Sequence, residues 1–128
     1  MKKKILIIDD EETMIVLLMF LLGEEYNVSS VKSAEDALLW LNDNLADLVI
    51  TDIKMQGMDG YQLLTQIRTR GYTKHTPIII LSANSSSSER VKCYRLGAQD
   101  FLSKPFNPEE LTEIVKKNLY PIHYAFEW

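Results

Sequence analysis

The feature that most constrains the fold is a regular alternation between short apolar runs and longer segments with helical signals. Three runs are apolar without interruption, at 5–8, 48–50 and 78–81. Runs of this length indicate strands covered on both faces, which is typical of parallel sheets. Two further strands are predicted at 27–31, where the sequence is more polar and suits a sheet edge, and at 101–102.

A helix is predicted after each of these strands: at 11–22, from Ser33 onward, at 61–70, at 86–96 and at 107–119. Ser33 with Asp36, and Ser86 with Glu89, have the spacing of a capping box. Asn107 followed by proline is a strong helix start. Five strand–helix units predict one α/β domain, a doubly wound, five-stranded parallel sheet with five helices on its two faces.

Bulk composition narrows the classes of protein that the chain can represent. It has 128 residues, enough for one core, and 46% of them are hydrophobic. The net charge of −4 gives no basic footprint, so we expect no direct binding of nucleic acid. Neither an apolar signal sequence nor a span long enough for a membrane is present, and Cys93 is the single cysteine. These features predict a cytoplasmic protein that does not bind membranes.

Residues suited to phosphate chemistry follow four of the predicted strands. Asp9 and Asp10 follow the first strand, Asp52 the third and Ser82 the fourth, and Lys104 follows the fifth. Ligands of doubly wound sheets bind outside the carboxyl ends of the strands, where these side chains would meet. Three carboxylates repel one another unless a cation neutralises them, and Mg²⁺ prefers oxygen ligands. A carboxylate there could attack phosphorus, while an ammonium and a hydroxyl bind the phosphoryl oxygens.

Each of these residues also has a simpler explanation. Asp9 and Asp10 could cap the first helix, Asp52 could begin a turn, and Lys104 could be a solvated loop residue. Taken singly, each simpler explanation is favoured. The joint placement of these residues at the ends of four strands favours a common site.

The sequence resembles the receiver domain family of two-component signalling over about 3–119. The segments that carry the resemblance are ILIIDDE at 5–11, DIKMQGMDG at 52–60, IILSA at 79–83 and LGAQDFLSKPF at 96–106. The resemblance implies a flavodoxin-like sheet with the strand order 2-1-3-4-5. It also implies a signalling domain rather than an enzyme.

The resemblance further implies a role for each site residue. Asp52 would be the phosphoacceptor and would bind Mg²⁺ together with Asp10 and the backbone carbonyl of Lys54, while Asp9 would act through a metal-bound water. Ser82 and Lys104 would hold the phosphoryl oxygens. Phe101 would be the aromatic that turns inward when Ser82 moves, and the Lys104–Pro105 bond would be cis. Gln56 departs from a frequent proline of the family, which predicts a more mobile loop after Asp52.

Three other functions remain open at this point. A phosphatase resembling the haloacid dehalogenase family also uses a strand-end aspartate and Mg²⁺, but it requires Asp-x-Asp where this chain has Asp9-Asp10. A flavin carrier would need a phosphate-binding loop after the first strand, where acids would repel the phosphate. A receiver that acts only as an unphosphorylated interaction module is the third possibility.

The predicted helix at 11–22 contains nine consecutive apolar residues, from Met14 to Leu22. We assign 14, 17, 18 and 21 to the sheet because they have the spacing of one helical face. Four residues then point outward as an apolar patch of the kind that marks interaction sites: Ile15, Val16, Met19 and Phe20. The resemblance implies that this patch is the docking surface for the phosphodonor. Packing of this patch on the C-terminal aromatic residues or on a second copy is the alternative.

The predicted domain spans 1–119, and 120–128 is either a tail or the start of a linker to an output domain that this chain lacks. The resemblance implies a sensor histidine kinase or a histidine phosphotransfer protein as the partner. A homodimer on activation is a further possibility.

Overall fold

The structure is a computed structural model that describes residues 1–121; the predicted tail or linker at 120–128 lies almost wholly outside the described residues. Strands and helices alternate as predicted, with one additional 3₁₀ helix before the fourth strand. The elements are β1 (Lys4–Ile8), α1 (Glu12–Leu22), β2 (Asn27–Val31), α2 (Ala34–Asp43), β3 (Leu48–Thr51), α3 (Gly60–Thr69), η1 (Gly71–Thr73), β4 (Ile78–Ser82), α4 (Ser87–Arg95), β5 (Asp100–Ser103) and α5 (Pro108–Leu119).

The five strands form one parallel sheet in the order β2-β1-β3-β4-β5, which confirms the predicted fold and strand order. Ile5 of β1 is paired with Val28 on one side and Leu48 on the other. The polar strand β2 lies at an edge, as its sequence indicates. All strands therefore end at one side of the sheet, where the predicted site residues follow them.

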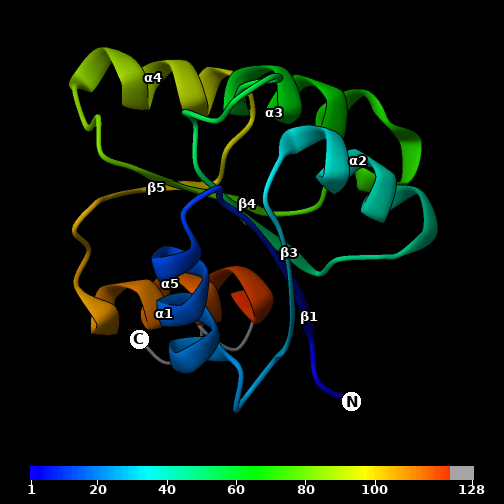
Figure 1. Cartoon of the computed structure of the whole chain (residues 1–128), viewed down its shortest axis with the longest axis vertical. Helices are drawn as coiled ribbons and strands as arrows, with labels where there is room; N and C mark the ends of the chain where they lie inside the picture. The colour runs from blue at the N-terminus through cyan, green and yellow to red at the C-terminus, as the bar shows by residue number, and fades with distance from the viewer. Residues whose placement is uncertain (122–128) are drawn as a thin grey trace.

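Helices cover the sheet in two layers, with α2, α3 and α4 on one face and α1 and α5 on the other (Figure 1). Alternate residues of β1 face the two layers. Leu6 and Ile8 pack with residues of α2 and α3, while Ile5 and Ile7 pack with residues of α1 and α5. Burial on both faces explains why the central strands are apolar at every position.

Side-chain caps fix most helix starts. Ser33 accepts a hydrogen bond from the backbone N–H of Asp36, and Ser86 accepts one from that of Glu89, at 3.0 and 3.3 Å. Neither helix has the reciprocal half of the predicted capping box. The complete box is at α3, where the Asp59 side chain and the Gln62 side chain each accept from the other residue's backbone N–H.

The structure corrects the predicted orientation of α1. Ile15, assigned to the docking surface, is buried at 5% exposure, whereas Leu17, assigned to the sheet, is 40% exposed. The buried residues are Ile15, Leu18 and Leu22. In a fully apolar run every position fits the core, so spacing alone does not set the face. The predicted buried face of α1 differs from the observed one by a rotation about the helix axis, and this rotation is smaller than the ~100° between neighbouring helical residues.

The guanidinium of Arg68, in the last turn of α3, joins two chain segments at the end of the sheet opposite the predicted site. It donates to the carbonyl oxygens of Gly97 and Thr76 at 2.8 and 2.7 Å, and to those of Thr73 and Lys74 at longer distances. Gly97 has φ +106°, and a Cβ there would lie 2.8 Å from the Arg68 side chain. The chain therefore needs glycine at 97 for both its backbone angle and its close approach to Arg68.

Cys93 lies on the inner face of α4 and is fully buried in the cluster that packs against α3. Burial, reinforced by the charge of Glu89, raises the pKa of its thiol to about 11. The thiol is therefore neutral and inaccessible in the folded protein.

Candidate functional site

The predicted site residues meet at the carboxyl ends of the strands. Asp9 and Asp10 follow β1, Asp52 follows β3, Ser82 ends β4, and Lys104 follows β5. One carboxylate oxygen from each of the three aspartates lies within 4.8 Å of those from the other two. Asp9 and Asp52 are buried at 2% and 8% exposure, while Asp10 is exposed. We call Asp9, Asp10 and Asp52 the acidic cluster.

Lys104 connects two members of the acidic cluster. Its Nζ donates to Asp9 Oδ2 at 2.9 Å and to Asp52 Oδ2 at 3.0 Å, and it lies 3.5 Å from Glu11 Oε1. Burial alone would lower the pKa of Lys104, but the hydrogen bonds to Asp9 and Asp52 outweigh it and the pKa is raised. Lys104 is therefore firmly protonated and holds the two buried carboxylates in place.

Burial dominates the electrostatics of Asp9 and raises its pKa, although Lys104 and the backbone N–H of Glu11 oppose the shift. The Glu11 N–H donates to Asp9 Oδ1 at 2.9 Å. Asp9 therefore binds the backbone just before α1, although α1 itself has no side-chain cap, and the functional role of Asp9 stays a prediction.

The backbone around Asp52 is fixed on both sides. Its N–H donates to the carbonyl of Ile8 at 3.1 Å, which ties the end of β3 to the end of β1. The N–H of Ile53 donates to Asp52 Oδ1 at 2.6 Å. Gly60, the first residue of α3, packs so closely that a Cβ there would lie 2.6 Å from the Asp52 carbonyl oxygen. The Asp52 carboxylate is thus held in one orientation, with Oδ2 directed to Lys104.

The loop after Asp52 runs from Ile53 to the cap residue Asp59. It is closed at its base by a hydrogen bond from the Gly60 N–H to the Ile53 carbonyl at 2.8 Å. Lys54 lies in this loop with an exposed side chain. The proposed metal-binding role of the Lys54 carbonyl stays a prediction.

Two further residues predicted to respond to phosphorylation are buried beside the cluster. The Ser82 hydroxyl oxygen accepts a hydrogen bond from the Asn84 N–H at 3.2 Å. Phe101 of β5 is 9% exposed and packs in the cluster beneath α2, α3 and α4. The Lys104–Pro105 bond is cis, as the resemblance implies. The Phe101 ring thus lies inside the protein in this structure, and its switching role stays a prediction.

The donor set of the acidic cluster suits a hard divalent cation. Three carboxylates and one ammonium leave two negative charges in excess when all are ionised. Oxygen ligands at this spacing, with the exposed side of Asp10 open to water, fit the preference of Mg²⁺ for a few carboxylates plus waters. The residues present can therefore hold such an ion.

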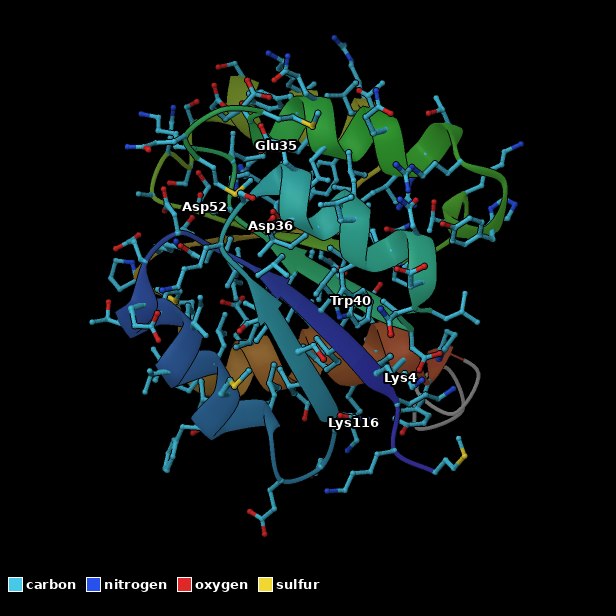
Figure 2. All side chains as sticks on the ribbon, turned by 45° about the vertical axis from the view of Figure 1, so that its right-hand side comes forward. Lys4, Glu35, Asp36, Trp40, Asp52 and Lys116 are labelled. Carbon is cyan, nitrogen blue, oxygen red and sulfur yellow. The ribbon has the colours of Figure 1, made fainter. Side chains whose placement is uncertain are left out.

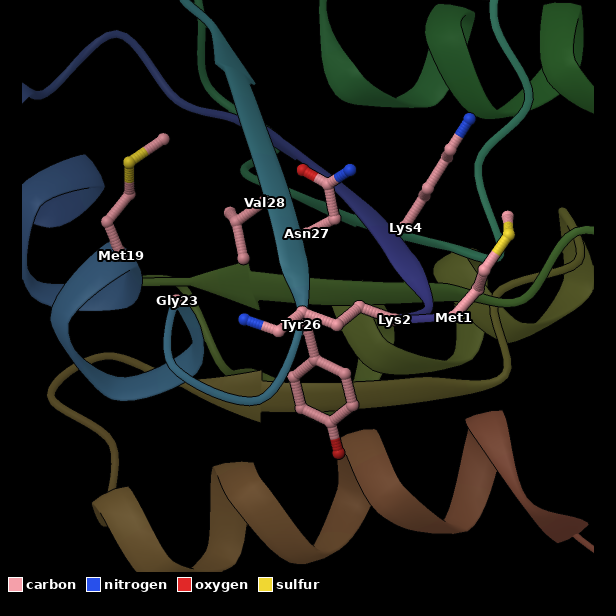
Figure 3. A pocket seen from close by; sticks show the side chains of 8 residues that line it. All are labelled: Met1, Lys2, Lys4, Met19, Gly23, Tyr26, Asn27 and Val28. Atoms are coloured by element: carbon pink, nitrogen blue, oxygen red, sulfur yellow. The ribbon is translucent and has the colours of Figure 1, made fainter.

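A hollow of about 650 Å³ lies elsewhere on the molecule, beside β2 and the end of α1 (Figure 3). Its lining includes Lys2, Lys4, Met19 and Tyr26, and none of the acidic cluster. We place the functional site at the acidic cluster because its charged groups lie at distances suited to binding a cation. The volume of a hollow gives no such chemical argument.

Sequence reasoning missed two residues near the site. Glu11 belongs to the first motif but had no predicted role, and it lies within reach of Lys104. Glu35 of α2 accepts a hydrogen bond from the Met58 N–H in the loop after Asp52. Its partner is 23 residues away and is a backbone group, so no pattern of residue types could indicate the contact.

Comparisons with known proteins agree with the geometry. The sequence model of the family described as "Response regulator receiver domain" matches residues 5–116. "Response regulator GtcR" of Aneurinibacillus migulanus is 41% identical over 110 residues, which cover 86% of this chain and 43% of that protein. "Response regulator Rre1" of Synechocystis is 37% identical over 95 residues, covering 74% of this chain and 41% of that protein. The chain spans less than half the length of these curated relatives.

Solved structures show the same likeness over nearly their whole length. A putative response regulator from Chloroflexus aurantiacus has a TM-score of 0.89 and 38% identity, with coverage of 93% of this chain and 98% of that one. The chemotaxis response regulator CheY4 of Vibrio cholerae has a TM-score of 0.87 and 28% identity, covering 93% and 100%. Among the described residues, no helix is long and apolar enough to cross a membrane.

Proposed function

We propose, because the chain belongs to the response regulator receiver domain family, that Asp52 accepts a phosphoryl group from a phosphohistidine donor. The domain would then change its conformation in response. Members of this family are signalling phosphoacceptors rather than classical enzymes, and they interact with histidine kinases. The observation that carries the proposal is the Lys104 ammonium bound to Asp52 and Asp9 within the acidic cluster.

In the proposed reaction a carboxylate oxygen of Asp52 attacks phosphorus while the bond from phosphorus to the donor nitrogen breaks, which gives an acyl phosphate. Bound Mg²⁺, held by Asp10, Asp52 and the Lys54 carbonyl with Asp9 acting through water, would supply neutralisation of the phosphoryl charge. Lys104 can turn from the carboxylates to a phosphoryl oxygen over a short distance, since it already contacts Asp52 at 3.0 Å. Catalysis here is mostly positioning and charge neutralisation.

The proposed switch uses the two buried residues beside the cluster. Ser82 would leave its hydrogen bond with Asn84 and donate to a phosphoryl oxygen, and Phe101 would respond from the neighbouring strand. β4 and β5 are paired directly at Ser82 and Ser103, so movement at the end of one strand is transmitted to the other.

The test of the proposal is labelling by acetyl phosphate with and without Mg²⁺, read by intact mass and by mapping the modified peptide. We expect one phosphate on the peptide that contains Asp52, dependent on Mg²⁺. Absence of labelling would favour the alternative of an unphosphorylated interaction module. Turnover of a small phosphomonoester would favour the phosphatase alternative, and a bound yellow chromophore the flavin carrier.

Replacing Asp10 with alanine should weaken Mg²⁺ binding at least ~10-fold. Loss of a group that only orients a metal ligand already weakens binding by about this factor, and loss of a direct ligand should weaken it at least as much. Without metal the variant should melt at the same or a slightly higher temperature, since one charge of the acidic cluster is removed. Calorimetric titration and thermal melts measure the two effects. Glu12→Ala, two residues away and paired with Lys32 at the surface, is the matched control. Equal Mg²⁺ affinities of the two variants would contradict the assignment.

The proposed docking surface for the donor keeps the exposed part of α1, now without Ile15. Val16, Met19 and Phe20 are 60%, 36% and 81% exposed, and Leu17 lies among them. An apolar patch of this kind on one helix usually marks an interaction site, and methionine packs adaptably. Pairing with a second copy on activation also stays a prediction.

Val16→Ser combined with Phe20→Ser should slow transfer from a phosphorylated histidine kinase domain by at least ~10-fold, while labelling by acetyl phosphate stays normal. Both side chains are exposed, so the fold should be retained. Val91→Ser with Tyr94→Ser, which removes a comparable exposed pair from α4, is the control. The docking proposal fails if the α1 and α4 variants accept phosphate from the kinase at the same rate.

A further inference from the structure

An exposed carboxylate on α2 holds the loop that follows Asp52. Oε2 of Glu35 accepts a hydrogen bond from the backbone N–H of Met58 at 3.0 Å. Figure 2 shows Glu35 and Asp36 at the amino-terminal end of α2, at the same end of the molecule as Asp52. The contact therefore connects a helix of the α2, α3 and α4 layer to the loop of the proposed phosphorylation site.

Glycine at position 57 makes this approach possible. Gly57 has φ +78°, and a Cβ there would lie 2.6 Å from Oε2 of Glu35. A larger residue would be strained in its backbone and would also displace the carboxylate. Gly57 and Glu35 are thus fitted to each other, and the hydrogen bond goes to the next residue along, Met58.

The rest of the loop shows what this contact controls. The Ile53–Gly60 hydrogen bond fixes the base of the loop, and the Asp59–Gln62 box fixes its entry into α3. The segment between, residues 54–57, contains no proline to restrict its backbone. Its first residue, Lys54, carries the carbonyl that is proposed as a metal ligand.

The charge state of Glu35 suits the contact. The N–H of Met58, followed by the N–H of Glu35 itself, lowers the pKa of this carboxyl. Glu35 is therefore ionised near neutral pH, and a hydrogen bond to an ionised acceptor is stronger than one to a neutral group.

We propose that Glu35 is a positioning residue for metal binding: it holds the loop at Met58 and so presets the Lys54 carbonyl toward the acidic cluster. The inference rests on the function proposed above. Glu35 would act as the supporting groups of metal sites generally do, by fixing a metal ligand in place before the ion binds.

The first measurement is calorimetric titration of the whole chain with MgCl₂. Glu35→Ala should weaken binding by about 10-fold, in line with the loss of a group that supports a ligand. Glu35→Gln keeps an acceptor of the same length without the charge and should stay within about 3-fold of wild type. Asp36→Ala removes the same charge from the same helical turn, but among the described residues the Asp36 side chain makes no hydrogen bond or ion pair with the loop. The Mg²⁺ affinity of this variant should be unchanged.

The second measurement needs no metal. Exchange of the Met58 amide, followed by NMR, should become at least ~10-fold faster in Glu35→Ala and stay near the wild-type rate in Glu35→Gln and Asp36→Ala. Gly57→Ala should weaken Mg²⁺ binding as Glu35→Ala does.

Three results would overturn the proposal: unchanged Mg²⁺ affinity in Glu35→Ala despite faster Met58 exchange, equal losses in Glu35→Ala and Asp36→Ala, and equal losses in the alanine and glutamine variants. If wild type itself bound no Mg²⁺ while Met58 stayed protected by Glu35, the proposed function would have failed, and the positioning role with it. The exchange rate of the Met58 amide in wild type distinguishes this outcome from one in which the Glu35–Met58 hydrogen bond does not form.

Discussion

Replacing Asp52 with asparagine is expected to abolish uptake of phosphate from acetyl phosphate. The amide has no anionic oxygen that can attack phosphorus, and its size and shape leave the surroundings almost unchanged. The retained side-chain oxygen can still accept from the Ile53 N–H, which binds Asp52 Oδ1 at 2.6 Å. Lys104 keeps its hydrogen bond to Asp9 at 2.9 Å. The loss should therefore reflect chemistry and not unfolding.

The measurement is intact mass after incubation with acetyl phosphate and Mg²⁺, with circular dichroism to verify the fold. Asp43→Asn is the matched control, because Asp43 is an exposed aspartate at the end of α2. The control should be labelled like wild type. Equal phosphate uptake by Asp52→Asn and wild type would place the acceptor elsewhere, and peptide mapping would then show whether Asp9 or Asp10 carries it.

Replacing Arg68 with methionine is expected to lower the free energy of unfolding by about 3 kcal/mol. The guanidinium binds Gly97, Thr73, Lys74 and Thr76 carbonyls and the side chain of Gln99. Hydrogen bonds from a charged donor each contribute roughly 1.5–3 kcal/mol, and water will replace some of those lost. Methionine preserves the packing of the aliphatic stem, so the loss should report on the hydrogen bonds.

Urea unfolding measures this difference, and Arg70→Met, two residues further along at the end of α3, is the control. Among the described residues, Arg70 donates to the Leu38 carbonyl and to the Asn42 side chain, both on α2. The Leu38 bond is long, at 3.3 Å, and the Asn42 bond is exposed to water, so their loss should cost no more than about 1 kcal/mol. Lysine at 68 can reach fewer of the carbonyls and should fall between wild type and methionine. If both methionine variants unfolded at the same urea concentration, Arg68 would not have the role we assign. Labelling by acetyl phosphate should persist in Arg68→Met below its transition.

The fold was predictable from the sequence because several local signals agree on it. The runs at 5–8, 48–50 and 78–81 form strands buried on both faces, and Asn107 caps α5 by accepting from the Glu109 and Glu110 N–H groups. The polar character of 27–31 identified the edge strand. Each of these properties depends on residues close together in the chain or on the burial of a whole strand. Both can be inferred from the pattern of residue types in a single sequence.

The acidic cluster was also predictable, since parallel strands deliver their following residues to one side of the sheet. Asp9, Asp10 and Asp52 lie together with Lys104 between two of them. The structure thus brings together the residues that were singled out, while their chemical roles await the experiments above.

Contacts that depend on the rotation of a helix or on backbone groups were not predictable. The rotation of α1 buries Ile15 and exposes Leu17, and it is set by packing against β1, β2 and α5. Glu35 binds the Met58 N–H and Arg68 binds the Gly97 and Thr76 carbonyls, so the partner side chains carry no signal. A sequence describes side chains, and these contacts are made to the main chain.

The burial of Cys93 makes the wild-type protein a ready host for spectroscopic labels. Its thiol is fully enclosed and has a pKa of about 11, so a maleimide dye at neutral pH has almost no thiolate to attack. A second cysteine introduced at an exposed position, such as Ser85 in the loop before α4, would then take the dye alone. Movement of that loop on phosphorylation could be followed by fluorescence in a chain whose own cysteine is left in place.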